Sequence, residues 1–260
     1  MKDIDKIYSE VELRGFCIVE NFLSENECNQ KIQVLEQLKH DRLKKSLYIG
    51  NDKNQVLYNY FFEYPELFDL IHSDLSQKVI SKLIDSDYVL TTASARNRQI
   101  SNDFKNKVKT SGIGWHSDGR YVKDKEIVKP SFSYFTIHTL DSFSEKNGAT
   151  QYVPNSHKKF IRPERLADYK YKTLVAPKGS LIFMDTALWH RAGQPSNHRR
   201  WAVFNMFSSW FVKPYWDFSK IFKAEQVKTF SPIIKKLLHF KSTPPHNYDG
   251  ATPTLSRLRK

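Results

Sequence analysis

The hydrophobic residues in the first third of the chain recur at the spacing of an α-helix. Ser24 and Glu27 form a capping-box pattern, and apolar residues follow at positions 28, 32, 35 and 38. This pattern predicts a helix of about fourteen residues. Pro65 opens a longer apolar stripe that predicts one helix over residues 65–84. Residues 4–13 are also predicted to be helical, and the polar, basic stretch 39–55 is predicted to be a surface loop.

The spacing changes to a strand-like alternation in the rest of the chain. Residues 15–22 already alternate between apolar and polar side chains, and further short segments follow at 88–95, 131–140, 171–176, 179–184 and 200–208. Helices followed by short strands, without β–α–β alternation, predict an antiparallel sandwich or barrel with helices on one side. No linker-like stretch interrupts residues 1–218, so we expect a single domain there and a basic, proline-containing extension over 219–260.

The net charge of +13 raises three classes of partner: nucleic acid, an anionic membrane surface and an anionic small molecule. More than half of the excess lies in the extension, where nine basic and two acidic residues give +7 and leave +6 for residues 1–218. A solvated extension that adds little to the core from about residue 243 explains this distribution better than a dedicated nucleic-acid surface.

Three observations exclude other classes of protein. The chain has no run of 18 apolar residues, so we expect no membrane-spanning helix. The first six residues carry acids and precede no apolar segment of the kind found in secretory signals. Cys17 and Cys28 are too few for a disulfide framework and lie in no zinc-binding pattern. We therefore expect a cytoplasmic protein.

The triplet His-Ser-Asp occurs twice, at 72–74 and at 116–118. Residues i and i+2 lie about 200° apart on a helix but share one face of a strand. His72 and Asp74 fall inside the predicted helix and so cannot chelate one ion together. His116 and Asp118 lie outside any helical pattern, just before the β-rich region, and are the candidate metal ligands.

An open metal site of the non-haem iron type needs a second histidine beside the first histidine and the carboxylate. The candidates are His138, His157, His190 and His198. His190 is favoured because it ends the apolar run 179–190, which is predicted to carry it to the mouth of a barrel. His138 is expected to be a hydrogen-bonded core residue, and His157 is expected to brace a turn.

Arg199 and Arg200 open the last apolar strand, and a buried guanidinium without a partner is costly. One explanation is a solvated strand end, and the other is a planar group that holds a carboxylate through two hydrogen bonds. Neighbours on a strand point to opposite faces, so only one of the two can enter a site. The residues that alternate with each arginine are largely apolar, and the pattern alone leaves the choice open.

Taken in order, these motifs resemble the phytanoyl-CoA dioxygenase family of Fe(II)/2-oxoglutarate oxygenases, which includes ectoine hydroxylases. The motifs are Trp115-His-Ser-Asp118, Asn147-Gly-Ala-Thr150, Pro154-Asn-Ser-His157, the run 179–190 and Arg199-Arg200, after an opening phrase at 15–24. The resemblance spans about residues 10–212. Two features depart from the family pattern: Asn155 replaces a usual glycine, and the interval from His190 to the arginines is short.

The resemblance implies a mostly β fold with flanking helices, a double-stranded β-helix (a jelly-roll, cupin-like barrel). It implies that His116, Asp118 and His190 hold Fe(II), with 2-oxoglutarate and O₂ as the other reactants. It favours Arg200 over Arg199 for the distal carboxylate of 2-oxoglutarate, because of its interval from His190 and the small Ala202. It also suggests that Gln99 contacts 2-oxoglutarate, and Trp115, Tyr121 and Trp189 are expected to line the substrate pocket because they neighbour the ligands.

The function implied is hydroxylation of a small-molecule metabolite, with an anionic one among the candidates, and release of succinate and CO₂. In halogenating relatives a glycine or alanine replaces the carboxylate ligand, so the presence of Asp118 favours hydroxylation. Two alternatives remain at this stage. One is a catalytically silent barrel used for binding, and the other is a nucleic-acid-binding or nucleic-acid-modifying protein, which the basic extension makes conceivable.

Overall fold

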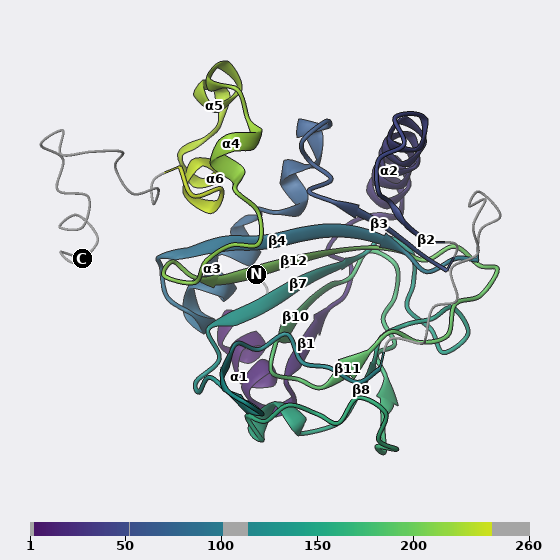
Figure 1. Cartoon of the computed structure of the whole chain (residues 1–260), viewed down its shortest axis with the longest axis vertical. Coiled ribbons are helices and arrows are strands. Elements are labelled where there is room, and N and C mark those ends of the chain that lie inside the picture. Colours follow the sequence, from purple (N-terminus) through teal and green to yellow (C-terminus); the bar gives the residue numbers. More distant parts are fainter. Residues whose placement is uncertain (1–2, 52, 101–113, 241–260) are drawn as a thin grey trace, which may run out of the picture.

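A seven-stranded antiparallel sheet forms the centre of the computed structural model, which describes residues 3–51, 53–100 and 114–240 (Figure 1). Its strands lie in the order β1 (Phe16–Val19), β10 (Leu181–Asp185), β7 (Ser133–Thr139), β12 (Trp201–Ser209), β4 (Tyr88–Asn97), β3 (Asn54–Tyr58) and β2 (Gly50–Asn51). The N-terminal strand therefore pairs with a strand from late in the chain. The late strand is β10, and the chain continues from it through a turn to His190.

A smaller sheet faces one side of the large one. It contains β11 (His190–Arg191), β8 (Gln151–Tyr152) and β9 (Lys172–Thr173), and the pair β5 (Tyr121–Lys123) and β6 (Glu126–Ile127) lies apart from it. Apolar side chains fill the space between the two layers, and the rings of Phe16 and Tyr152 meet edge to face at 4.9 Å. This antiparallel, two-layer barrel confirms the predicted jelly-roll fold.

Helices cover the other face of the large sheet. They are α1 (Ile4–Arg14), α2 (Glu25–Lys44), the 3₁₀ helix η1 (Pro65–Leu70) and α3 (Asp74–Leu83), while a short 3₁₀ turn, η2 (Ser156–Lys158), lies beside the small sheet. Period-two alternation divides each strand between the two faces. On β10, Leu181 and Phe183 pack toward the helices, whereas Ile182 and Met184 pack toward the barrel interior. In the part of the chain that the structure describes, no helix has the length and apolarity needed to cross a membrane.

The helix after Ser24 is longer than its apolar pattern predicted. The capping box of Ser24 and Glu27 is confirmed, but α2 runs for 20 residues. The surface loop expected over 39–55 is therefore wrong. Arg42 continues the helix and is buried, because its guanidinium binds both carboxylate oxygens of Glu63 and the carbonyl of Tyr58. The rest of the stretch contributes β2 and the start of β3.

The single helix expected over 65–84 is also wrong, because the chain breaks between η1 and α3. Ser73 provides the physical reason. Its hydroxyl accepts the N–H of Ser76 at 3.1 Å and so caps a new helix that begins at Asp74. His72 lies in the break and Asp74 in the first turn of α3, and these two residues belong to no cluster of metal-binding side chains among the described residues.

The first half of the extension is helical and packs onto the domain. It forms α4 (Phe218–Ile221), α5 (Ala224–Thr229) and α6 (Pro232–Leu237). Its buried side chains join the helix-side core that also contains Phe61. They are Phe222, Ile234, Leu237 and Leu238, and Phe218, directly before the extension, joins the same core. The solvated character expected for this segment is thus not observed before residue 241, and the expectation for residues from 243 onward lies outside the described residues.

Candidate metal centre and adjoining cavities

His116 and His190 lie on two segments that pair through their backbones. The N–H of each residue donates to the carbonyl of the other, at 3.0 Å from His116 and 2.9 Å from His190. This differs from both expectations. His116 lies in an isolated bridge rather than a strand, and β10 ends at Asp185, so that His190 begins a new strand after a turn. The turn moves His190 from the large sheet to the small one.

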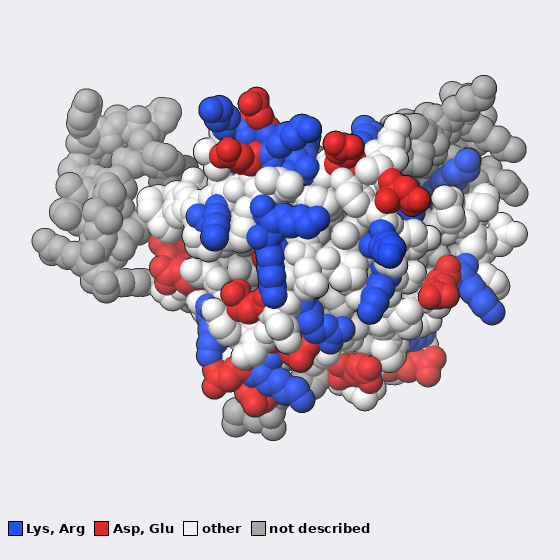
Figure 2. Space-filling view, turned by 90° about the horizontal axis from the view of Figure 1, so that it is seen from below, with Lys and Arg blue, Asp and Glu red and all other residues white. Residues whose placement is uncertain are grey.

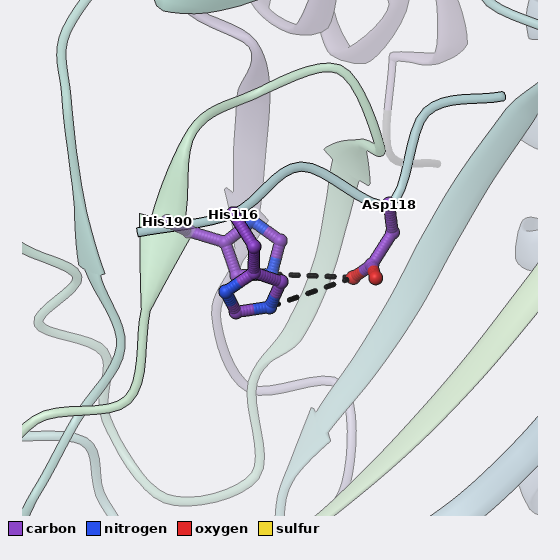
Figure 3. A group of neighbouring side chains, drawn as sticks. All are labelled: His116, Asp118 and His190. Carbon is purple, nitrogen blue, oxygen red and sulfur yellow. Dashed lines mark ion pairs between the residues drawn. The ribbon is translucent and has the colours of Figure 1, made fainter. Parts of the chain in front are cut away.

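Asp118 is fixed by the same turn. Its backbone N–H donates to the carbonyl of Thr186 at 2.9 Å, and the hydroxyl of Ser117 donates to the same carbonyl. Figure 3 shows the result: the imidazoles of His116 and His190 lie side by side, and the carboxylate of Asp118 faces them. One ligand atom from each residue lies within 4.8 Å of the others. Within the described ranges this is the one such cluster of three.

The hydrogen bonds of the two imidazoles determine which nitrogen faces the carboxylate. Nδ1 of His116 contacts the carbonyl of Gly114 at 3.1 Å, and Nδ1 of His190 contacts that of Leu188 at 2.8 Å. Because a carbonyl only accepts, each Nδ1 carries a proton and each Nε2 is left toward Asp118. The Nε2–Oδ2 distances are 4.0 Å for His116 and 3.3 Å for His190. A lone pair and a carboxylate this close need a proton or a metal ion between them.

The electrostatics of the cluster favour a bound cation. Burial, and next the charge of His190, lower the pKa of His116 to about 4, so its imidazole is neutral at neutral pH. Burial alone would raise the pKa of Asp118, but the neighbouring imidazoles, first His190 and then His116, outweigh it and hold that pKa well below its usual range. A neutral imidazole beside an ionised carboxylate is the protonation state in which both are metal ligands.

The three side chains open into a cavity of about 110 Å³, called here the inner cavity. Its apolar wall consists of Phe135, Met184 and Phe204. Arg200 also lines it, and its guanidinium is almost fully buried, with Nε and Nη1 lacking any hydrogen-bond partner. Burial, and next the charges of Arg98 and Arg96, lower the pKa of Arg200 to about 9. A buried guanidinium with two unpartnered nitrogens is an arrangement typical of an anion-binding site.

Not every residue singled out by its sequence position reaches this cavity. Gln99 donates to the carbonyl of Asn197 at 3.1 Å and accepts from Asn97 at 3.2 Å, and it is absent from the cavity lining. Trp115 and Trp189 are buried in a small cluster with Val153. Tyr121 is exposed and donates to the carbonyl of Ser117. None of the three aromatic residues is among the described residues that line the two cavities.

Two of the other candidate histidines have structural roles. His138 is buried, and its Nε2 donates to the carbonyl of Leu70 at 2.8 Å, which confirms the expected core histidine. His157 contacts the carbonyl of Glu12 at 3.1 Å and so braces its turn against α1, also as expected. Asn155, which opens that turn, has φ +61°. Asparagine tolerates this left-handed conformation better than most residues, which explains how it stands where the family usually has glycine.

Two site residues had not been singled out from the sequence, Arg96 and Arg98. They lie two positions apart at the end of β4, and both line the inner cavity. Arg98 is buried, with Nη2 donating to the carbonyl of Gly193 at 2.6 Å and Nε without a partner. The signal was present in the sequence, since arginines at i and i+2 on a buried strand share a face.

Comparisons with known proteins agree with this geometry. Residues 11–202 match the profile of the phytanoyl-CoA dioxygenase (PhyH) family. An uncharacterized protein from Mycobacterium bovis is 23% identical over 231 residues, which cover 83% of this chain and 79% of that protein. A dioxygenase from Aspergillus fumigatus is 30% identical over 125 residues, covering 44% of this chain and 40% of the relative.

Solved structures share the fold. HygX from Streptomyces hygroscopicus, determined with nickel and 2-oxoglutarate bound, superposes with a TM-score of 0.64 at 13% identity, covering 81% of this chain and 89% of HygX. EctD from S. alaskensis, with bound Fe, gives 0.63 at 16% identity, covering 80% and 79%. Because the family match spans most of the chain, the chain belongs to the phytanoyl-CoA dioxygenase family and is an enzyme of the Fe(II)/2-oxoglutarate-dependent oxygenase type.

Proposed function

We propose that the protein hydroxylates a small molecule with Fe(II), 2-oxoglutarate and O₂, releasing succinate and CO₂. In this proposal His116, Asp118 and His190 hold the iron. Two imidazoles and one carboxylate with open positions suit Fe(II) in oxygenases. The observation that carries the proposal is the pair of Nε2 atoms at 3.3 and 4.0 Å from one carboxylate oxygen, with each Nδ1 engaged by a backbone carbonyl.

Arg200 is proposed to bind the distal carboxylate of 2-oxoglutarate. Arg200 is buried and lines the cavity that His116, Asp118 and His190 also line. Two of its guanidinium nitrogens have no hydrogen-bond partner. A guanidinium can bind a carboxylate through paired, charge-assisted hydrogen bonds, and these unpartnered nitrogens leave Arg200 able to do so. The ring of Phe143 lies 4.5 Å from the guanidinium carbon and restricts its orientation. HygX, which shares the fold, was solved with 2-oxoglutarate bound, and this supports 2-oxoglutarate as the ligand.

The contribution of the chain to catalysis is orientation and exclusion of water. When bound, iron and 2-oxoglutarate supply the oxidising power for hydroxylation through oxidative decarboxylation of 2-oxoglutarate with O₂. Arg200 and the three ligands set the position of the reacting groups, and Phe135, Met184 and Phe204 keep the inner cavity apolar. Asp118 provides a carboxylate at the position that is glycine or alanine in halogenating relatives, which supports hydroxylation as the outcome.

A reducing compartment such as the cytoplasm is part of the proposal. Cys17 and Cys28 are both buried and free of disulfides. Burial raises the pKa of each thiol, which keeps both protonated. Two buried, unreactive thiols fit a protein that has no need of disulfides for stability.

The two alternatives predict different surfaces and activities. On the face shown in Figure 2, lysines and arginines are interspersed with aspartates and glutamates, so the described residues of this face form no continuous basic track for a nucleic-acid backbone. A catalytically silent barrel would need a damaged ligand set, whereas His116, Asp118 and His190 converge. Small-molecule oxidation therefore has the better support.

The test is anaerobic titration of the purified protein with Fe(II) and then 2-oxoglutarate. We expect one iron per chain, a visible charge-transfer band when 2-oxoglutarate is added, and slow succinate formation once O₂ is admitted. Absence of iron binding, or iron binding without succinate, would support the silent barrel instead. Salt-sensitive retention of bulk nucleic acid in place of turnover would favour a nucleic-acid-binding protein.

A further inference from the structure

A second, larger cavity adjoins the metal centre. It measures about 670 Å³ and is called here the outer cavity. Asn54, Arg98, Arg191 and Ala192 line both cavities, so the outer one opens onto the inner one. Its volume lies within the usual range for small-molecule sites, about 300–1,000 Å³. A substrate in the outer cavity would therefore lie next to the site of oxidation.

The outer cavity has an unbalanced charge. Its basic lining residues are Lys53, Arg98, Arg165 and Arg191, and none of the described residues that line it is acidic. The inner cavity adds Arg96 and Arg200 against one carboxylate, that of Asp118. Since Asp118 is assigned to the metal and Arg200 to 2-oxoglutarate, the other arginines have no described counter-charge within the two linings.

Arg98 and Arg191 are held at the junction by contacts that leave part of each guanidinium free for a ligand. Arg191 donates from Nε to the side-chain oxygen of Gln151 at 2.7 Å, and its guanidinium stacks on Trp115 at 4.3 Å and on Tyr171 at 4.9 Å. Arg98 is 8% exposed and has an unpartnered Nε. Cations fixed in this way lose little side-chain entropy when an anion binds.

Arg165 is brought to the same place by its backbone. The N–H of Trp115 donates to the carbonyl of Arg165 at 2.9 Å. A Cβ at Gly114 would lie only 2.5 Å from that carbonyl oxygen, so glycine is needed for this close approach. The segment around Arg165 is thus attached to the segment that carries His116. Arg165 lines the outer cavity.

We propose that the outer cavity is the substrate site and that it recognises an anionic oxygen group, a phosphate or a carboxylate, through Arg98, Arg165 and Arg191. This inference rests on the proposed function only in that the bound anion is a substrate. The anion site itself is argued from the three arginines. Planar guanidinium groups bind such groups through paired, charge-assisted hydrogen bonds. A neutral substrate would leave two buried or stacked cations without a counter-charge among the described lining residues.

Calorimetric titration with inorganic pyrophosphate tests the proposal on the full-length protein, both metal-free and loaded with Fe(II) and 2-oxoglutarate without O₂. We expect saturable binding that weakens as salt is added. Arg165→Gln and Arg191→Gln should each raise Kd about tenfold, equivalent to about 1.4 kcal/mol. Arg14→Gln removes the same charge from α1, where Arg14 pairs with Glu10, and should leave Kd unchanged.

The outcomes separate this inference from the proposed function. Pyrophosphate binding that depends on Arg165 and Arg191 in a protein that takes up no iron would support the anion site and refute the oxygenase. Iron and 2-oxoglutarate binding with no pyrophosphate binding, or with equal losses in Arg14→Gln, would overturn the anion site alone. The exposed Arg165 serves as the second variant if Arg191→Gln lowers the thermal stability.

Discussion

Arg199 and Arg200 are adjacent in the chain but reach opposite sides of the large sheet. Arg199 forms a two-point ion pair with Asp141, at 3.0 and 3.1 Å, on a half-exposed side chain. Arg200 is buried on the barrel side and lines the inner cavity together with His116, Asp118 and His190. The alternation that made the two residues competitors therefore gives them different surroundings: Arg199 is in an ion pair, and Arg200 has unpartnered nitrogens in the cavity.

This division predicts a clear difference between the alanine variants. Arg200→Ala removes the buried cation and should weaken 2-oxoglutarate binding by about 2–5 kcal/mol, because the carboxylate is left unpaired. That range corresponds to roughly 30- to 5,000-fold in affinity. Arg199→Ala should change it only a few-fold. The measurement is the dependence of succinate formation on 2-oxoglutarate concentration, and the reverse ranking would transfer the role to Arg199.

The two His-Ser-Asp triplets predict opposite results in metal binding. His116→Ala and Asp118→Ala should abolish iron uptake while circular dichroism shows an intact fold. His72→Ala and Asp74→Ala should bind one iron as the wild type does, because these residues lie at the η1–α3 break and belong to no metal-ligand cluster. Elemental analysis after anaerobic loading distinguishes the cases. Equal losses at both triplets would refute the assignment.

The packing of α6 predicts that the start of the extension contributes to stability. Leu238 is fully buried in the helix-side core. Leu238→Ala should lower the free energy of unfolding by about 2–5 kcal/mol. Leu13→Ala, on the exposed face of α1, is the matched control and should have little effect. Urea unfolding measures both, and a Leu238→Ala protein as stable as Leu13→Ala would mean that α6 does not hold its place in solution.

His138 predicts part of the dependence of stability on pH. Burial lowers its pKa from 6.5 to about 4, and its Nδ1 has no partner. As the pH falls from 6.5 to 4 the unfolded chain takes up a proton that the folded protein refuses, so stability falls across this window by about 3 kcal/mol. Asp185, whose pKa burial raises to about 6, acts in the opposite sense.

The variant His138→Gln isolates this contribution, because its amide can still donate to the carbonyl of Leu70. The unfolding free energy of the wild type minus that of the variant should decrease as the pH falls from 6.5 to 4. Asp185 affects both proteins alike. A difference that stays constant over this window would show that the folded protein protonates His138 as readily as the unfolded chain does.

The sequence predicted the fold best where one local interaction determines the structure. The capping box at Ser24 is of this kind, and it is observed. The break at Ser73 was missed because an apolar stripe continues on both sides of it, and only the hydroxyl cap reveals it. Strand β3 was missed because its polar residues are buried by long-range pairing with β4.

The sequence predicted the candidate metal-ligating residues of the site but not the residues that line its cavities. His116, Asp118 and His190 follow from residue type and motif order, and the structure brings them together. Which residues line the cavities depends on how the two layers pack. Trp115 adjoins a ligand in the sequence and yet stacks behind Arg191, whereas Arg98 is distant in the sequence and lies at the junction of the cavities.

The backbone pairing of His116 with His190 predicts that metal occupancy and folding are thermodynamically linked. The two proposed ligands lie far apart in the sequence and meet only in the folded state, so the unfolded chain offers no equivalent site. An ion that binds only the native state stabilises it, by about 2.7 kcal/mol when its free concentration is a hundred times Kd. The melting temperature of this enzyme should therefore report the free iron concentration around it, and a chelator should act as a mild denaturant.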